Sequence, residues 1–366
     1  MFLKNAWYVI AWSNEVERNL FERTIIGEPI CLYRKEDGVV VAINNMCPHR
    51  FAPLHMGKLI DDVVECPYHG LKFDEHGKCV YNPHSETIPQ KACVKSYPLV
   101  EKHDMLWIWM GEPALADADK VPDFSCHTDE RFPTVGGVIE MEANYELITD
   151  NLMDLSHVEF IHEGILGSDS IVSGKHEVLQ EGTTVYSNRW CPDGLAPPAW
   201  DMMFDNYGKP VDHWLYMRWD APAHMLLDVG ITPVGRPRDE GIWVYGTDIL
   251  TPKDEHTTYY FWGVSRSYAQ NDSSAGDAWC EAIDGAFNGQ DKPMIEAQQK
   301  MMGQRTFEEL SPVLLTSDSG AMRVRRVLTN LIKAQEGGTI PEPALLSLKK
   351  LLTEPGKKTD RITPVV

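Results

Sequence analysis

The chain has 366 residues, of which 43% are hydrophobic and 24% are charged. This length suits two domains, and the composition is that of a soluble globular protein with sizeable cores. Lys and Arg total 34 and Asp and Glu total 54, so the formal net charge is −20. Such an acidic balance argues against binding to nucleic acid or to an anionic membrane surface.

No apolar run approaches the roughly 18 residues that a membrane span requires. One of the longest, residues 105–110, is only as long as a strand. The apolar stretch at the N-terminus is soon followed by Asn14 and Glu15 rather than by a small-residue cleavage site, so no signal peptide is predicted. We therefore expect a cytoplasmic protein. The eight cysteines are scattered and do not form a secreted disulfide pattern.

The first part of the chain, residues 1–112, has the pattern of a β domain with frequent turns. Short apolar runs at 38–43 and 106–109 predict strands, and the sequence of residues 74–77 predicts a hairpin turn. Residues 113–133 contain a polar, proline-bearing stretch that we interpret as the junction between domains.

The second part, residues 134–354, is expected to mix long strands with a few helices, which makes the whole chain α+β. Strands are predicted at 241–245 and 257–263, and an amphipathic helix is predicted at 322–332. Residues 277–302 have helical spacing, with breaks expected near Gly289 and Pro293. Residues 355–366 are expected to form a loose tail.

Two segments of the first domain each combine one cysteine with one histidine. They read Cys47-Pro-His49 and, after sixteen intervening residues, Cys66-Pro-Tyr-His69. In a Rieske cluster two thiolates hold one iron and two imidazoles hold the other, which raises the reduction potential. A tetrahedral zinc site is the alternative, although zinc sites usually pair Cys with Cys and His with His. The order of these residues favours the two-iron, two-sulfur cluster.

A second candidate metal site lies in residues 151–162, which read Asn-Leu-Met-Asp-Leu-Ser-His-Val-Glu-Phe-Ile-His. Asp154 and His157 are three residues apart and share one face of a helix. His157 and His162 are five apart, about 140° round a regular helix, so both can bind one metal only if the helix ends or distorts between them. Gly164 and Gly167 follow and fit such an ending.

Two imidazoles and one carboxylate on one face of ferrous iron leave positions open for dioxygen and substrate. If Asp154 has another task, the carboxylate must come from elsewhere. Asp291 is the preferred candidate because it lies at a predicted helix start, where its direction is fixed. Asp284 and Glu296 are the competitors.

Together the two motifs resemble the Rieske non-haem iron oxygenases, and in particular the oxygenase components of the vanillate and dicamba O-demethylase branch. The likeness covers nearly the whole chain. The segments Asn5-Ala-Trp-Tyr-Val, Asn82-Pro-His and Ile249-Leu-Thr-Pro carry the closer similarity, as does Ala196-Pro-Pro-Ala-Trp200.

The resemblance implies an N-terminal all-β Rieske domain and a C-terminal helix-grip domain, in which a twisted antiparallel sheet wraps round a helix. It implies that His157, His162 and Asp291 bind the catalytic iron and that Asn151 belongs to the catalytic site. It further implies a head-to-tail homotrimer, in which Asp154 bridges His69 of one subunit and His157 of its neighbour by hydrogen bonds.

The implied chemistry is oxidative O-demethylation or N-dealkylation of a small aromatic substrate with O2. A carbon next to oxygen or nitrogen is hydroxylated, and the product collapses to release an aldehyde. Electrons are expected from NADH or NADPH through a separate flavin reductase, with or without a ferredoxin. The chain itself has no Gly-x-Gly-x-x-Gly motif for the nucleotide.

The sequence departs from the dicamba branch where that branch holds the carboxylate of its substrate. A histidine and a tryptophan of that branch correspond here to Asp248 and Ala282, so an anion clamp is not expected. An aspartate repels a carboxylate unless it is protonated or paired. The pocket is expected to take a neutral aryl ether or N-alkyl anilide, or a phenol. Candidate apolar lining residues are Trp200, Met203 and Leu227.

Three other functions are compatible with parts of the pattern. Hydroxylation of a ring or a methyl group would use the same two iron centres. An electron carrier would use the cluster alone, but it would need only about the first 112 residues. A binding module stabilised by zinc would use the Cys and His residues without redox chemistry.

Overall fold

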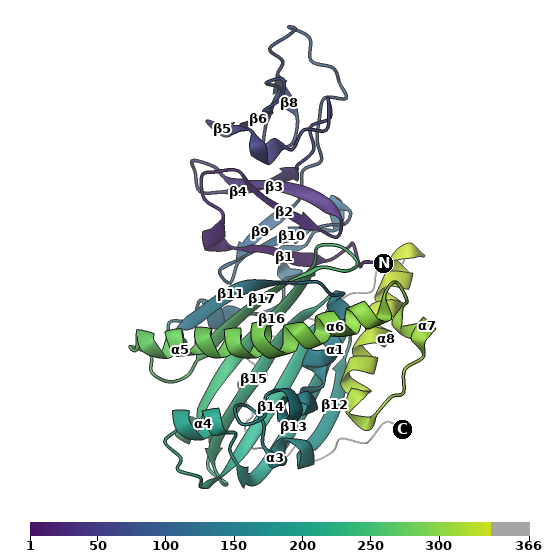
Figure 1. Ribbon diagram of the computed structural model, residues 1–366. Coiled ribbons are helices and arrows are strands. Elements are labelled where there is room, and N and C mark those ends of the chain that lie inside the picture. The colour runs from purple at the N-terminus through teal and green to yellow at the C-terminus, as the bar shows by residue number, and fades with distance from the viewer. Residues whose placement is uncertain (338–366) are drawn as a thin grey trace.

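The computed structural model describes residues 1–337 and shows two parts in sequence (Figure 1). The first is built from β-strands and turns, and the second from one large sheet with helices. The predicted tail at 355–366 and the end of the predicted second domain lie outside the described residues. None of the described helices combines the length and the hydropathy that a membrane crossing requires.

The first part contains three small antiparallel sheets, with the strand orders β1-β10-β9, β2-β3-β4 and β5-β6-β7-β8. The predicted strands at 38–43 and 106–109 correspond to β4 and β10. The predicted hairpin turn is also confirmed, because the Gly77 amide donates to the Asp74 carbonyl over 2.9 Å. The strands are β1 (Trp7–Trp12), β2 (Phe21–Ile25), β3 (Glu28–Arg34), β4 (Val40–Asn44), β5 (Lys58–Ile60), β6 (Val63–Glu65), β7 (Lys72–Phe73), β8 (Cys79–Tyr81), β9 (Leu99–Lys102) and β10 (Met105–Trp109).

The two parts share one continuous apolar core, which runs from β1 and β10 into the strands of the second part. Polar contacts reinforce it: the Thr251 hydroxyl donates to the Val9 carbonyl over 2.8 Å, and the Ile26 amide donates to the Pro252 carbonyl over 2.8 Å. Residues 113–133 include three short 3-10 turns, and Phe124 of this segment is fully buried. The first part is therefore fixed against the second.

The second part is organised by a seven-stranded antiparallel sheet of order β11-β17-β16-β15-β14-β13-β12. Long strands rich in β-branched and aromatic residues form it, as expected of such sequences. The predicted strands at 241–245 and 257–263 begin β16 and β17. The strands are β11 (Thr134–Met141), β12 (Lys175–Glu181), β13 (Thr184–Leu195), β14 (Pro210–Asp220), β15 (His224–Pro233), β16 (Ile242–Pro252) and β17 (Thr258–Arg266).

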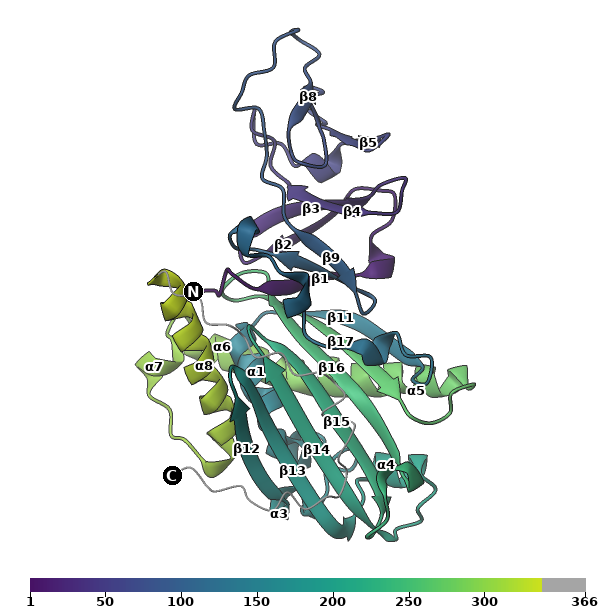
Figure 2. The same ribbon diagram turned by 180° about the vertical axis from the view of Figure 1, so that it is seen from behind.

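One face of this sheet is crossed by a long helical rod that contains α5 and α6, whereas the view from behind shows the opposite face of the strands (Figures 1 and 2). This arrangement confirms the predicted helix-grip fold. The α-helices are α1 (Tyr145–Met153), α2 (Val158–Ile161), α3 (Asp169–Ser173), α4 (Pro198–Met203), α5 (Ser273–Ile283), α6 (Lys292–Met302), α7 (Phe307–Leu310) and α8 (Ser319–Glu336). The 3-10 helices are η1 (Ser13–Glu15), η2 (Leu54–Met56), η3 (Pro113–Leu115), η4 (Ala118–Lys120), η5 (Ser125–His127), η6 (Leu155–His157), η7 (Arg238–Glu240) and η9 (Thr316–Asp318).

The predicted breaks near Gly289 and Pro293 are wrong. A π-helix, η8 (Asp284–Asp291), joins α5 to α6 without interruption. Pro293 is tolerated because it occupies the first turn of α6, where its missing N–H costs little. Asp291 is therefore not at a free helix start. It is the last residue of a π segment, and such segments are frequent at functional sites.

The C-terminal helix α8 contains the predicted amphipathic segment 322–332, and a half-buried ion-pair cluster anchors it to α1. Arg325 donates to Asp150 over 2.7 Å and to Glu146 over 2.7 Å. Burial raises the pKa of Asp150 to about 6 even with the arginine beside it, and burial also raises the pKa of Glu146. The guanidinium is thus the main group that favours the ionised form of these two half-buried carboxylates.

Replacing Arg325 by methionine is expected to cost about 1.5–3 kcal/mol, since two half-buried carboxylates lose their charged hydrogen-bond donor. Both carboxyl groups have raised pKa values when folded, so the unfolded chain releases their protons first and stability falls as the pH rises. The drop in apparent melting temperature should therefore be larger at pH 8 than at pH 5. Arg326→Met, at an exposed position of the same helix, is the control. Equal losses in both variants would contradict this account.

Candidate metal centres

The Cys47 and Cys66 loops are built in the same way. In each, the cysteine amide donates to the carbonyl five residues later, Ala52 or Leu71, over 2.9 and 2.8 Å. In each, the residue four positions after the cysteine donates back to the cysteine carbonyl. That residue, Phe51 or Gly70, has a positive φ of 61° or 69°. The two loops therefore have the same backbone conformation, and they lie next to each other at the end of the domain.

The loops bring together the four residues predicted to hold the cluster. Cys47 and Cys66 are buried, and burial together with the neighbouring Cys66 thiol raises the pKa of Cys47 to about 11. The rings of His49 and His69 lie nearer to solvent, with their centroids 4.5 Å apart. Nδ1 of His69 is buried and has no hydrogen-bond partner among the described residues.

This donor set fits a two-iron, two-sulfur cluster. A buried thiol becomes a thiolate only if a cation compensates the charge, as iron does. An imidazole nitrogen that is buried without a hydrogen-bond partner is costly unless it has a metal to bind. The pairing of two thiols on the inside and two imidazoles on the outside matches the ligand division of a Rieske centre.

The second cluster of candidate ligands depends on a broken helix, as its spacing predicted. Helix α1 ends at Met153, and the Asp154 side chain accepts the Ser156 amide over 3.0 Å to start the 3-10 turn η6. Helix α2 then carries the chain to His162. The change from one helix type to another turns both rings to the same side, with centroids 5.6 Å apart.

Asp291 reaches this histidine pair from the π segment. Its Oδ2 lies 3.1 Å from Nε2 of His162, and its Oδ1 lies 3.7 Å from Nε2 of His157. One ligand atom from each of the three residues falls within 4.8 Å of the others. Neighbouring ligands of an octahedral ion at about 2.1 Å are about 3 Å apart, so these separations suit one metal ion.

The outer nitrogens of both rings are engaged, which leaves the inner ones for a metal. Nδ1 of His157 donates to the backbone carbonyl of Asp154 over 2.7 Å, and Nδ1 of His162 donates to Oε1 of Gln290 over 2.7 Å. The Asn151 amide donates to Oδ1 of Asp291 over 3.2 Å. Such outer contacts fix the tautomer and orientation of ligand histidines. Gln290 was missed in the sequence, where only its position next to Asp291 pointed to it.

The two competing carboxylates lie elsewhere. Asp284 is exposed and accepts a hydrogen bond from Asn288 over 2.7 Å. Glu296 accepts the amide of Glu142 over 2.9 Å. Of the three candidates, only Asp291 faces the histidines.

The expected bond between the Asp154 carboxylate and His157 does not form within this chain. The ring takes the backbone carbonyl of Asp154, and the carboxylate lies beside Ser156 and 3.9 Å from Arg189. Burial opposes ionisation, but these partners hold the pKa of Asp154 below its usual value. The Asp154 carboxylate is thus ionised. Within this chain, Asp154 contacts the His157 ring through its backbone carbonyl and not through its carboxylate.

A mostly apolar cavity of about 120 Å³ opens beside the metal ligands, between the sheet and the helical rod. Trp200, Leu227 and Asp248 line it as predicted. Met203 is not a lining residue; it accepts a hydrogen bond from Tyr268 behind Trp279. Ala282 is exposed, and the tryptophan that does reach the cavity from α5 is Trp279, less than one turn earlier. Met203 and Ala282 were therefore wrongly expected to line the pocket. Met203 contacts Tyr268 instead, and helix α5 turns Ala282 toward solvent.

Asp248 is the most unusual residue of the cavity wall. It is 4% exposed, and one of its oxygens accepts the Tyr260 hydroxyl over 2.5 Å. Burial raises its pKa to about 7, with Tyr260 lowering it and Asp291 raising it. Burial therefore favours the protonated form of this carboxyl group more than it is favoured in an exposed aspartate.

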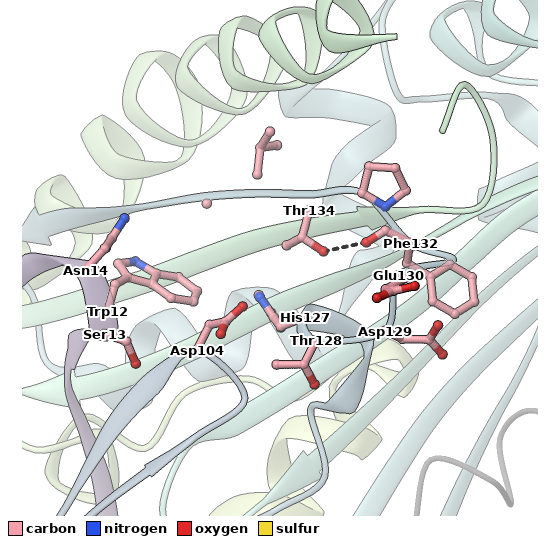
Figure 3. A pocket seen from close by; sticks show the side chains of 13 residues that line it. Trp12, Ser13, Asn14, Asp104, His127, Thr128, Asp129, Glu130, Phe132 and Thr134 are labelled. Carbon is pink, nitrogen blue, oxygen red and sulfur yellow. Dashed lines mark hydrogen bonds between the residues drawn. The ribbon is translucent and has the colours of Figure 1, made fainter. Parts of the chain in front are cut away.

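A larger pocket of about 710 Å³ lies at the junction of the two parts. Figure 3 shows its side chains spread along it, from Trp12 and Asn14 at one end to Phe132 and Asp129 at the other. Two of its polar side chains already have partners: His127 bonds Thr247 over 2.7 Å, and Asp129 pairs with Arg131. Size alone does not make it the reactive site, because no ligand set converges there.

Comparison with known proteins agrees with this geometry. Residues 6–98 match the Rieske [2Fe-2S] domain, and residues 141–334 match the vanillate O-demethylase oxygenase C-terminal domain. The chain belongs to the Rieske non-haem iron oxygenases. As a Rieske oxygenase component it takes a [2Fe–2S] cluster and a mononuclear iron, and it depends on separate partner components for electrons.

Two relatives and one solved structure illustrate the match. This oxygenase is 36% identical over 337 residues to the oxygenase component of chloroacetanilide N-alkylformylase from Rhizorhabdus wittichii, covering 92% of this chain and 97% of that one. It is 37% identical over 331 residues to the oxygenase component of dicamba O-demethylase from Stenotrophomonas maltophilia, covering 90% and 98%. The crystal structure of dicamba monooxygenase bound to 3,6-dichlorosalicylic acid superposes with a TM-score of 0.86 at 36% identity, covering 92% and 99%.

Asp291→Ala is expected to lose the mononuclear iron and keep the cluster, because only one of the two donor sets loses a ligand. Iron per chain should fall by about one third while acid-labile sulfide stays constant. Asp284→Ala and Glu296→Ala are matched controls on the same helical rod and should retain all the iron. Unchanged iron in Asp291→Ala would mean that another carboxylate is the ligand.

Proposed function

We propose that this oxygenase removes an alkyl group from the oxygen or nitrogen of an uncharged aromatic compound, with electrons from a separate reductase. The observation that carries the proposal is the position of His157, His162 and Asp291 on the wall of a mostly apolar cavity. Ligand sites are typically of this kind, apolar with a few fixed polar groups.

The preference for an uncharged substrate rests on the charges around the cavity. Its lining residues, all in the described part of the chain, include no lysine or arginine. Asp248 and Asp291 are both buried in its wall. Taking a carboxylate or sulfonate into such a site without a cation costs several kcal/mol. Chloroacetanilide N-alkylformylase is therefore a better guide to the substrate of this oxygenase than dicamba monooxygenase, whose structure holds a chlorinated salicylic acid.

Iron bound at this site would supply the activation of dioxygen. The protein's own residues perform the rest. Three ligands on one face leave the opposite face to the cavity. Trp200, Trp262 and Trp279 offer aromatic surfaces against which a ring can pack, and they exclude water. Asp248, in its protonated form, can donate to an ether or amide oxygen of the substrate.

Electron supply is expected to cross between subunits. The strands β5 to β8 that carry the cluster loops form one tip of the molecule, and other sheets separate them from the catalytic domain (Figure 1). A cluster at this tip is better placed to serve a neighbouring subunit than its own. We propose that a homotrimer brings His69 of one subunit to Asp154 of the next, in line with the ionised, half-buried state of that carboxylate.

Dealkylation is tested with the iron-loaded protein, a surrogate ferredoxin and reductase, and a panel of methoxylated and N-alkylated aromatics. The expected product is one formaldehyde, or a longer aldehyde, per dealkylated ring. His162→Ala should retain the cluster spectrum and release no aldehyde. A hydroxylated product that keeps its alkyl group would instead identify a ring- or methyl-hydroxylating enzyme.

Asp154→Asn is expected to keep both metal centres yet slow electron transfer from the cluster by about one to two orders of magnitude, since outer-shell partners typically matter 10–100-fold. The measurement is reoxidation of the reduced cluster on mixing with oxygen and substrate. Asp150→Asn, another buried acidic residue of the same region, controls for a general effect of lost charge. Wild-type reoxidation in Asp154→Asn would refute the bridge.

A further inference from the structure

His213 is a buried histidine with no hydrogen bond. It lies on β14 and is 1% exposed, and it lines the cavity beside Trp200, with ring centroids 6.3 Å apart. Neither Nδ1 nor Nε2 has a partner among the described residues. Leaving a buried polar group unpaired costs about 1–3 kcal/mol. Since an apolar residue of similar size would avoid that cost, the imidazole calls for another explanation.

The strand register places His213 at one end of the cavity. Its partner on β15 is Ile231, whereas Asp248 on β16 pairs with Met225 of the same strand. Ile231 and Met225 are six residues apart on β15, so the backbones of His213 and Asp248 lie about 20 Å apart along the strand direction. Leu215 and Leu227 line the wall between them. The cavity is therefore elongated along the strands, with one polar side chain near each end.

The metal ligands lie toward the Asp248 end. Tyr260, which bonds Asp248, stacks on Phe287, four residues before Asp291 on the helical rod. Trp279, twelve residues before Asp291 on the same rod, packs against Trp200, which lies beside His213. Burial lowers the pKa of His213 to about 3. His213 is consequently a neutral imidazole at any ordinary pH, with one donor and one acceptor. It is unsuited to holding an anion, and it is suited to an uncharged polar group.

We propose that His213 is a specificity-determining residue that hydrogen-bonds an uncharged carbonyl or hydroxyl group at the end of the substrate remote from the iron. This inference rests on the proposed function in one respect, that the cavity is the substrate site. It narrows the substrate to an elongated aromatic molecule with the reactive alkyl group at one end and a neutral polar group at the other.

The test uses two pairs of probes of nearly equal shape: para-methoxyacetophenone with para-isopropylanisole, and the corresponding meta isomers. Binding to the iron-loaded protein is measured without oxygen by quenching of tryptophan fluorescence, since three tryptophans line the cavity. In the wild type, the ketone of at least one pair should bind about tenfold more tightly than its isopropyl partner, the effect of one buried hydrogen bond.

His213→Leu should reduce that ratio to about one, and His213→Asn, which keeps a donor and an acceptor, should restore part of it. His224→Leu is the matched control. His224 is equally buried, packs against Trp107 with ring centroids 5.1 Å apart, and does not line the cavity. It should leave the tenfold ratio intact.

Two results would overturn the inference: a ratio that is the same in His213→Leu and the wild type, or a wild type that does not favour the ketone of either pair. A melting temperature of His213→Leu at or above that of the wild type is also expected, and a large fall would indicate a structural role instead. Aldehyde release is scored separately. Tight ketone binding without aldehyde would therefore count against dealkylation and leave the role of His213 standing.

Discussion

The site depends on a geometric constraint: three ligand atoms from distant parts of the chain must meet within the reach of one ion. Regular helices would not achieve this. Two histidines five residues apart diverge on an α-helix, and the break at Asp154 turns them to one side. The π segment before α6 directs Asp291 toward them. Each irregularity costs stability locally, and metal binding offsets that cost.

The same irregular segments also orient the ligands. Asp154 supplies the carbonyl that fixes the tautomer of His157, and Gln290 does the same for His162. The broken helix therefore does two things: it places the ring, and it provides the acceptor that holds it. On the opposite wall, the straight strands β14 to β17 contribute alternate side chains to an apolar cavity. Irregular helices thus carry the chemistry, and regular strands shape the space for the substrate.

Much of this organisation could be predicted from sequence because it is encoded locally. The Cys and His spacings identify the cluster loops, and the interval between His157 and His162 requires a helix break. What escaped prediction depends on details of helix pitch and strand register. A π-helix has no simple sequence signal, so a break was expected near Gly289. Because the helix pitch was not known, Ala282, which is exposed, was wrongly expected to line the pocket, and Trp279 was not identified. His213 gave no signal at all, because its lack of partners is visible only in three dimensions.

The central claim is that one chain holds two different iron environments, a spin-coupled pair and a single ferrous ion. Mössbauer spectroscopy of protein loaded with ⁵⁷Fe tests it most directly. The account predicts that about two thirds of the absorption comes from the coupled pair, with one sulfur-ligated and one nitrogen-ligated iron, and about one third from high-spin ferrous iron with nitrogen and oxygen ligands. A spectrum with only the coupled pair, or with no coupled pair, would contradict it.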